Sequence, residues 1–391
     1  MQYCNKIRLL VLIALFQLTL GCSIGRSASP IKDGSEKGGI HIVWDASTLK
    51  KVSAPGPRYC GYSRLTQLYD QSLLAVYEAD ENTVCVKSTD LGTTWSTPIT
   101  IAPYSEGVAM AVPDILELRD HSILVCYNPR PGKTATKKRF GIRTKKSYDG
   151  GTTWQDERLL YEADYSFQNG CWEPSAIQLP NGEIQLFFAN EGDYLSSDEQ
   201  NISMLRSADN GLTWTKAREI VSFRSGSRDG MPSPILLQNG NDIVFSIEDN
   251  GFGNFKPYTI RCTVANNWTT TVGATSSDRN YALAEPIANT IYAGAPYLRQ
   301  LKTGQTILSY QGTEGRTNSI NFAEMKVGIG DNQARNFTKK TVPFSIAANK
   351  SGLWNSLAVL SDNTIIALTS TNSYSSGNTE IWMIKGHVIN E

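Results

Sequence analysis

The sequence lacks several features that mark common classes of protein. Its 391 residues carry 37 basic and 37 acidic side chains, so the formal net charge is zero. A balanced charge gives no electrostatic attraction for nucleic acid or for an anionic membrane face, and no basic run with interleaved aromatic residues occurs. Long helical periodicity of the hydrophobic residues is also hard to find. We therefore expect neither nucleic-acid binding nor a helical fold.

Ligands for metal ions are scarce as well. The chain has 3 histidines and 7 cysteines, and none of them shows metal-ligand spacing. We therefore expect no metal and no cofactor, and none of the histidines is given a catalytic role. Cys85 and Cys126 stand inside apolar strands, where a free cysteine acts as a small buried hydrophobic residue.

The apolar run from Leu9 to Leu20 is too short to cross a bilayer, but it has the length of an export signal, about twelve residues. It leads into Gly21-Cys22 and resembles a bacterial lipoprotein signal, although Thr19 stands where leucine is usual. We expect residues 1–22 to be a lipoprotein-type signal with Cys22 lipidated, and residues 23–39 to be a flexible tether. The protein would then be exported, to the outer membrane or the periplasm, with a lipid as its membrane contact. An ordinary cleaved signal peptide is the alternative.

What the chain does contain is a repeated two-strand unit with a polar turn. The six copies begin at Leu68, Leu118, Leu179, Leu237, Leu301 and Leu360. A period of about sixty residues with about four short strands is typical of a β-propeller blade. We therefore predict an all-β fold, a six-bladed β-propeller over residues 40–391. The strand at 39–44 is expected to pair with the last blade near residues 380–384, which would close the ring.

A second motif supports this fold independently. The pattern Ser-x-Asp-x-Gly-x-Thr-Trp, an Asp-box, occurs at residues 88–95, 147–154 and 207–214. In such a turn the aspartate accepts backbone N–H bonds, the glycine supplies a positive φ and the tryptophan packs between blades. We interpret these boxes as structural.

Alignment of the copies predicts which residues gather at one mouth of the propeller. Six residues before each leucine stand Tyr62, Val112, Glu173, Met231, Ala295 and Trp354, and four before it stand Arg64, Asp114, Ser175, Ser233, Tyr297 and Ser356. Because side chains alternate along a strand, the two sets should share a face. The second strands end in Glu78, Asn128, Glu191, Glu248 and Tyr310. The predicted mouth is therefore rich in carboxylates.

Such a set suits glycoside hydrolysis, in which one carboxylic acid protonates the leaving oxygen and a second carboxylate attacks the anomeric carbon. Glu173 stands beside Trp172 and Pro174, an apolar setting that would raise its pKa and suit a general acid. Glu248 ends an apolar strand and would be the nucleophile. Tyr310 ends the equivalent strand one blade on, where its hydroxyl would hydrogen-bond that nucleophile.

These residues resemble a family. The Asp-boxes are similar to those of the sialidase superfamily, and Trp172-Glu173-Pro174, Arg228-Asp229-Gly230-Met231-Pro232 and Glu248 resemble glycoside hydrolase family 93, the exo-arabinanases. The resemblance implies a retaining exo-hydrolase that releases arabinobiose from α-1,5-linked arabinan, with Glu173 as acid/base and Glu248 as nucleophile. Tyr297 competes with Tyr310 for the supporting role.

The remaining predicted site residues would bind an oligosaccharide or polysaccharide substrate. They are Arg64, Asp114, Asn128, Trp172, Glu191, Arg228, Tyr297 and Trp354. Simpler interpretations stay open. Glu173 could be a rim carboxylate that caps a strand, and Glu191 could be the true partner of Glu173. Arg64 could pair with a rim carboxylate, and Trp354 could form a wall of the channel. We expect the protein to be a monomer.

Two other functions remain as alternatives. An exo-α-sialidase would need several arginines for the substrate carboxylate, and only Arg130, Arg228 and Arg316 stand in loops beyond Arg64. A non-catalytic glycan-binding propeller at the cell surface would keep the aromatic rim without needing two catalytic carboxylates.

Overall fold

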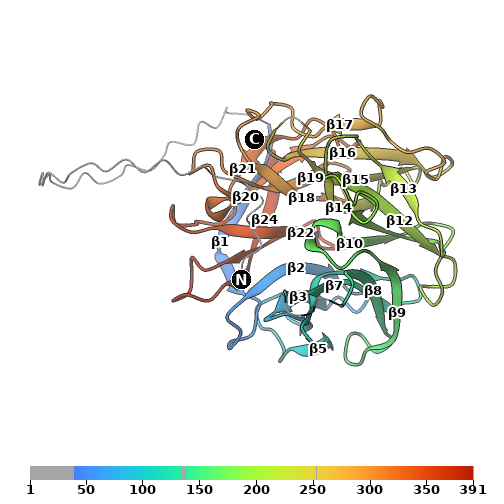
Figure 1. Cartoon of the computed structure of the whole chain (residues 1–391). Coiled ribbons are helices and arrows are strands. Elements are labelled where there is room, and N and C mark those ends of the chain that lie inside the picture. The colour runs from blue at the N-terminus through green and yellow to red at the C-terminus, as the bar shows by residue number, and fades with distance from the viewer. Residues whose placement is uncertain (1–38, 134, 136, 252, 391) are drawn as a thin grey trace, which may run out of the picture. The chain divides into compact units, whose positions relative to one another are not determined.

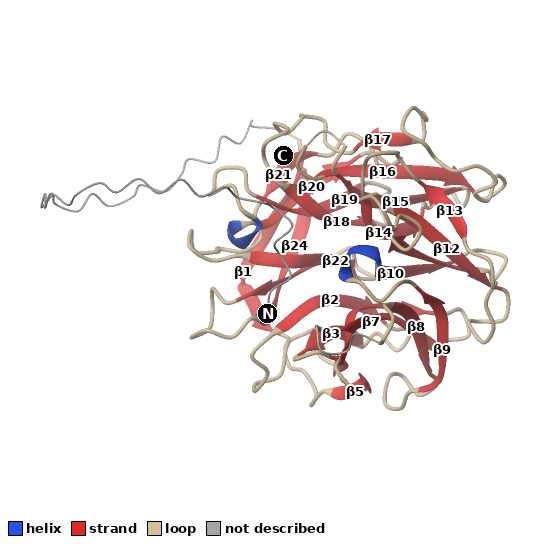
Figure 2. Ribbon diagram, in the orientation of Figure 1, coloured by secondary structure: helices blue, strands red, loops and turns tan. Residues whose placement is uncertain are grey.

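The computed structural model describes residues 39–133, 135, 137–251 and 253–390. The predicted signal, the lipidation at Cys22 and the tether up to residue 38 lie outside the described residues. Strands make up almost all of the regular structure, and the two single-turn helices are η1 (Phe167–Asn169) and η2 (Ile320–Phe322) (Figure 2). None of the helices in these described ranges has the length and hydropathy to span a bilayer.

The strands form six four-stranded antiparallel sheets (Figure 1). From the innermost strand outward, blade 1 is β2 (Cys60–Gln67), β3 (Leu73–Ala79), β4 (Asn82–Ser88) and β5 (Ile99–Ala102); blade 2 is β6 (Val108–Glu117), β7 (Ile123–Pro131), β8 (Gly141–Ser147) and β9 (Gln155–Glu162); blade 3 is β10 (Cys171–Gln178), β11 (Ile184–Asn190), β12 (Asn201–Ser207) and β13 (Glu219–Ser222). Blade 4 is β14 (Asp229–Leu236), β15 (Asp242–Asp249), β16 (Lys256–Thr263) and β17 (Arg279–Tyr281); blade 5 is β18 (Ala293–Gln300), β19 (Thr306–Gly312), β20 (Glu324–Gly330) and β21 (Thr338–Thr341); blade 6 is β22 (Gly352–Val359), β23 (Ile365–Thr371), β24 (Glu380–Asn390) and β1 (Ile40–Lys51).

The ring closes through the two ends of the propeller. β1 pairs antiparallel with β24, with Trp44 opposite Gly386, so the first strand completes the last blade. The six innermost strands contact one another in cyclic order, from β2 through β22 and back to β2. The predicted six-bladed β-propeller and its closing strand are confirmed, and the closure removes an exposed sheet edge.

Each of the six leucines closes the same turn. The backbone N–H of Leu68 donates to the carbonyl of Ser72 at 2.8 Å, and the other five leucines make the equivalent bond. All six side chains are buried. The repeat in the sequence is therefore a repeat of one hydrogen-bonded turn held by one buried residue.

The Asp-boxes have the predicted geometry. In the first box Asp90 accepts the Thr94 N–H at 2.9 Å, the Ser88 hydroxyl accepts the Gly92 N–H at 2.7 Å, and Gly92 has a φ of 88°. The other two boxes repeat these contacts, and their tryptophans pack against the cores between blades. Their structural role is what the sequence predicts.

One feature of the inner strands has no signal in the sequence. The residue six places before each leucine has a positive φ, between 47° and 53°, and the register of every inner hairpin shifts there. Two residues of the inner strand oppose one residue of its partner, which defines a β-bulge. The bulge residues are Tyr62, Val112, Glu173, Met231, Ala295 and Trp354. Positive φ is uncommon outside glycine, so this ring of six is a built feature of the propeller.

Candidate active site

The bulges surround a small cavity at the centre of the propeller. Five of the bulge residues form an apolar cluster with Ala111, and Glu173 is the polar member of the ring. The cavity is lined by Arg64, Val112, Pro113, Glu173, Pro174, Ser175, Met231, Pro232, Pro296 and Tyr297. Residues from both aligned sets therefore meet at one cavity, and the prolines between them line it as well, because the bulge interrupts strict alternation.

Glu173 carries a carboxyl group that is largely withdrawn from solvent, with 17% of the side chain exposed. Its Oε1 lies 3.4 Å from the guanidinium of Arg130, which also packs 4.9 Å from the ring of Trp172. Burial raises the pKa of Glu173, and the positive charges of Arg130 and Arg228 act against that rise. The apolar setting expected from Trp172 and Pro174 is present, but an arginine also contacts the carboxyl.

Glu248 reaches the same region from the next blade. Its Oε2 accepts the backbone N–H of Ala295 at 2.7 Å. Two glycines make room for it, because a Cβ on Gly230 would lie 3.2 Å from Glu248 Oε1 and a Cβ on Gly294 would lie 2.6 Å from Oε2. Burial raises the pKa of Glu248 to about 7, opposed by the Ala295 N–H and reinforced by the negative charge of Glu173. The charge of Glu173 therefore favours the protonated form of Glu248.

Burial favours the protonated form of both carboxyl groups, and the charge of Glu173 adds to this effect at Glu248. A pair of this kind is suited to acid/base and nucleophilic steps at a glycosidic bond. The contact with Arg130 favours the charged form of Glu173, so the resting electrostatics alone do not assign the acid and the nucleophile.

A third carboxyl group of the same kind lies on blade 1. Glu78 is 9% exposed, and it pairs with Gly61 as Glu248 pairs with Gly230. Burial raises the pKa of Glu78 to about 7, against the charge of Arg130 and the N–H of Val112. Arg130 is thus shared by Glu78 and Glu173 across the mouth.

Glu191 holds two neighbours in place. Its Oε1 accepts the Trp172 indole N–H at 3.0 Å and also pairs with the guanidinium of Arg228. It does not occupy the position that corresponds to Glu248, because that register position in blade 3 is Ala189. Glu191 therefore positions Trp172 and Arg228 rather than replacing Glu248 as the partner of Glu173.

The other predicted binding residues differ in how they lie. The Arg64 guanidinium sits 4.7 Å from the ring of Tyr297, and Asp114 accepts the hydroxyl of Ser175, all along the axial channel. Trp354 stacks on Tyr62 with the ring centroids 4.4 Å apart.

Asn128 is fully buried, so the predicted direct contact with substrate is wrong. Its amide donates to the carbonyls of Gly141 and Cys171, and its oxygen accepts the Arg130 Nε at 2.7 Å. Asn128 therefore acts on the site through Arg130.

The placement predicted for Tyr310 is also wrong. The residue that corresponds to Glu248 in blade 5 is Gln311, which pairs with Gly294, so Tyr310 points to the other face of the strand. There it is fully buried among apolar side chains, and its hydroxyl donates to Glu314 at 2.8 Å. A one-residue error in the strand end turned the side chain away from the mouth.

Tyr292 approaches Glu248 instead. A Cβ on Gly294 would lie 2.7 Å from the Tyr292 hydroxyl and 2.6 Å from Glu248 Oε2, so both atoms crowd the same side of this glycine. The hydroxyl also accepts the Gln311 side-chain N–H at 2.7 Å. Tyr292 stands three places before a bulge residue, as Tyr59 and Arg228 do, and extending the alignment by those three residues would have found it.

A buried ionic network supports the strands that carry Glu248 and Arg228. Arg279 is 8% exposed and bonds Asp229 at 2.6 and 3.0 Å and Asp249 at 2.7 Å. Asp249 follows Glu248 directly and pairs with Asp229 across the hairpin. The network therefore fixes the end of β15 next to Glu248. Over the ranges that the structure covers, no cluster of three or more His, Cys, Asp or Glu residues is arranged to hold a metal ion.

The fold and the site together define a sialidase-like propeller with a carboxylate-lined mouth. A BNR repeat-like domain model matches residues 74–244. A search of the curated proteins found no match.

Solved structures share the fold at low sequence identity. A Dyadobacter fermentans protein of unknown function is 15% identical with a TM-score of 0.67, covering 90% of this chain and 100% of that one. The family 93 α-L-arabinofuranosidase of Fusarium graminearum, solved with arabinobiose, is 16% identical with a TM-score of 0.64, covering 86% and 97%. The NanB sialidase of Streptococcus pneumoniae is 12% identical with a TM-score of 0.61, covering 88% and 70%. The resemblance of the sequence to sialidase-type propellers is thus confirmed at the level of fold.

Proposed function

We propose that this protein is a retaining, exo-acting glycoside hydrolase that releases arabinobiose from α-1,5-linked arabinan. The observation that carries the proposal is the pair Glu173 and Glu248 on neighbouring blades, two buried carboxyl groups whose pKa values are both raised by burial, with the charge of Glu173 adding to the rise at Glu248. The likeness in fold to an arabinofuranosidase solved with arabinobiose supports the choice of sugar.

In the proposed reaction the Glu248 carboxylate attacks the anomeric carbon while the Glu173 carboxylic acid protonates the departing glycosidic oxygen. Glu173, now a carboxylate, then takes a proton from the water that hydrolyses the glycosyl–Glu248 ester. Substrate binding would displace water from both groups, and the developing positive charge on the sugar would favour the ionised nucleophile.

The charges around the mouth favour an uncharged sugar over a sialic acid. Arg130 contacts Glu173 and Arg228 contacts Glu191, so both arginines face protein carboxylates. The mouth also carries Glu78 and Glu248, which would repel a substrate carboxylate. An exo-α-sialidase is the second candidate, supported by the fold that the chain shares with NanB.

We also propose that the protein is exported and anchored through lipidated Cys22. A surface enzyme acting on polysaccharide fits this location, and metabolic labelling with a fatty-acid probe, compared with Cys22→Ser, tests it.

Product analysis tests the activity. The parent and Glu173→Gln are incubated with debranched arabinan and with sialyllactose, and the products are separated by chromatography. Release of a disaccharide from arabinan by the parent, lost in the variant, supports the proposal. Release of sialic acid would support the second candidate, and no release from either would leave a binding propeller.

A further inference from the structure

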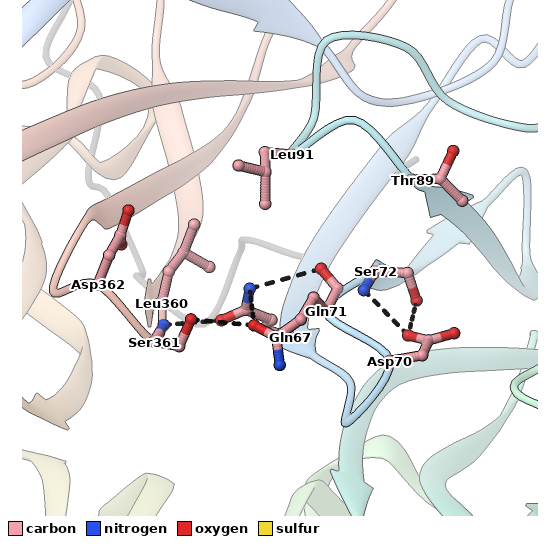
Figure 3. A pocket seen from close by; sticks show the side chains of 9 residues that line it. All are labelled: Gln67, Asp70, Gln71, Ser72, Thr89, Leu91, Leu360, Ser361 and Asp362. Carbon is pink, nitrogen blue, oxygen red and sulfur yellow. Dashed lines mark hydrogen bonds between the residues drawn. The ribbon is translucent and has the colours of Figure 1, made fainter.

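A groove opens on the face of the propeller opposite the mouth, at the seam between blades 6 and 1 (Figure 3). Its volume is about 350 Å³, and its walls come from the hairpin turns of the two blades and from the first Asp-box. The lining residues are Gln67, Asp70, Gln71, Ser72, Thr89, Leu91, Leu360, Ser361 and Asp362. Its floor is polar, because Ser361 donates its N–H to Gln67 at 2.7 Å and its hydroxyl to Gln71 at 3.0 Å.

The same seam is filled at the two sister junctions that have an Asp-box. Between blades 1 and 2, the Lys87 ammonium lies 3.1 Å from Asp70 Oδ2 and 3.4 Å from the carbonyl of Gly150 in the second box. Between blades 2 and 3, the Lys146 ammonium lies 2.7 Å from the carbonyl of Asn210 in the third box. In both, a lysine from the third strand of one blade bridges to the next blade's Asp-box.

The residue that follows the buried leucine also fills those seams. At the first junction it is Tyr69, whose ring lies 4.1 Å from His121, and at the second it is Arg119, which donates to the carbonyl of Pro180. At the junction of blades 6 and 1 the same position is Ser361, whose short side chain bonds Gln71 at the floor and leaves the space above it open.

The lysine that corresponds to Lys87 and Lys146 does not line the seam between blades 6 and 1. Lys385 has the register of Lys87 and Lys146, since it pairs with Ile366 as they pair with Leu74 and Leu124. Lys385 is not among the residues that line the groove; it lies opposite Asp45 on β1, and its charge helps to lower the pKa of that carboxyl group. The groove therefore retains, without the lysine, the two acceptors that hold Lys87: a hairpin aspartate (Asp362) and the Asp-box carbonyl position (Leu91), the second of which also holds Lys146.

We propose that this groove is a docking site for a lysine side chain presented by a partner protein. The alkyl chain would lie along Leu91 and Leu360, and the ammonium would bond Asp362 and the Leu91 carbonyl, as Lys87 bonds Asp70 and Gly150. Because the groove lies on the hairpin-turn side, a docked partner leaves the mouth open to a polysaccharide. This site is independent of the activity proposed above.

The test is a titration of the whole protein, followed by NMR at the side-chain amides of Gln67 and Gln71 and the backbone amide of Ser361. The probe is Nα-acetyl-lysine methylamide, and the matched control is the same molecule acetylated at Nε, which lacks the charge. We expect saturable shifts at these three residues with the first compound alone. Equal shifts with the acetylated compound, or no saturable shift, would overturn the proposal.

Three variants sharpen the result. Asp362→Asn should weaken binding at least about threefold, since the charge-assisted bond is lost. Ser361→Arg should fill the groove as Arg119 does and abolish binding without lowering the melting temperature, whereas Ser361→Ala should keep it. Binding that appears only in Lys385→Met would show that the chain fills the groove itself, which contradicts a site open to a partner.

Discussion

Glu78 and Glu248 occupy the same position in blades 1 and 4, three blades apart in a ring of six. Each lies opposite a glycine in a bulged hairpin and accepts the N–H of the next blade's bulge residue, Val112 or Ala295. Blade 5 has Gln311 at this position, and its amide oxygen accepts the Trp354 N–H at 2.8 Å. Blades 1, 4 and 5 thus place an acceptor here whereas blade 3 has Ala189, and of these acceptors Glu78 and Glu248 are the ones that can carry a charge.

This relationship predicts how stability depends on pH. Burial raises the pKa of Glu248 and of Glu78 from 4.5 to about 7, so the folded state binds these protons more tightly than the unfolded state does. The stabilisation is fully present below about pH 4.5 and is lost as the pH rises through about 7. Glu248→Gln keeps the acceptor, as Gln311 does, and should be more stable than the parent at pH 8 by up to about 3 kcal/mol. Urea unfolding at pH 5 and pH 8 measures this, and an equal difference at both pH values would contradict it.

Gly294→Ala should damage activity more than folding. The added Cβ would lie 2.6 Å from Glu248 Oε2 and 2.7 Å from the Tyr292 hydroxyl, so the carboxylate must move. Gly294 does not have a positive φ, and the backbone therefore tolerates alanine. We expect kcat on arabinan to fall by at least about tenfold, since displacement of a catalytic group by under an ångström is costly. Gly273→Ala, where an added Cβ would meet no atom within 4 Å, controls for the loss of a glycine, and an active Gly294→Ala would count against the position of Glu248.

The buried network around Arg279 should dominate the local stability of blade 4. Arg279→Met leaves Asp229 and Asp249 buried without their shared partner, which should cost about 3 to 5 kcal/mol of unfolding free energy. Arg158 pairs with Asp156 at the surface with 41% of its side chain exposed, and Arg158→Met should cost less than about 1 kcal/mol. Denaturant unfolding compares them, and equal losses would refute the distinction.

Tyr310→Phe and Tyr292→Phe should have opposite effects on stability and on kcat, because the Tyr310 hydroxyl is buried in the core and the Tyr292 hydroxyl lies at the mouth. Tyr310 bonds Glu314 inside the core, so its variant should lose about 1 kcal/mol of stability and keep its kcat. Tyr292 crowds the Glu248 carboxylate, so its variant should keep its stability and lose about tenfold in kcat, roughly 1.4 kcal/mol. The reverse pattern in steady-state kinetics would restore Tyr310 to the site.

The sequence alone predicted the parts of the molecule that repeat. The six leucines and the three Asp-boxes each have a short local cause, a buried residue or a hydrogen-bonded turn, and each lies where it was predicted. The closing strand joins the predicted blade, but residues 40–45 pair with 385–390 rather than with 380–384. The bulges could not be predicted, because Tyr62, Val112 and Glu173 have no shared chemistry and their positive φ comes from packing around the axis.

Only those site residues whose places follow from the regular repeat could be predicted from the sequence. Glu173 and Glu248 follow from counting back or forward from a leucine in a regular hairpin. Tyr310 was misplaced because the position in blade 5 that corresponds to Glu248 is Gln311, one residue further on. The link between Asn128 and Arg130 was missed because β7 runs on to Pro131, whereas the prediction ended this strand at Asn128 and placed Arg130 in a loop.

The most direct test of the proposed catalytic pair is the residue that becomes covalently labelled. A mechanism-based arabinofuranosyl inactivator is incubated with the parent, with Glu173→Gln and with Glu248→Gln, and the peptides are analysed by mass spectrometry. We predict one adduct in the parent, on the peptide that carries Glu248, and none in Glu248→Gln. An adduct on Glu173 would reverse the two roles, and an adduct on a tyrosine or none at all would contradict the proposed pair.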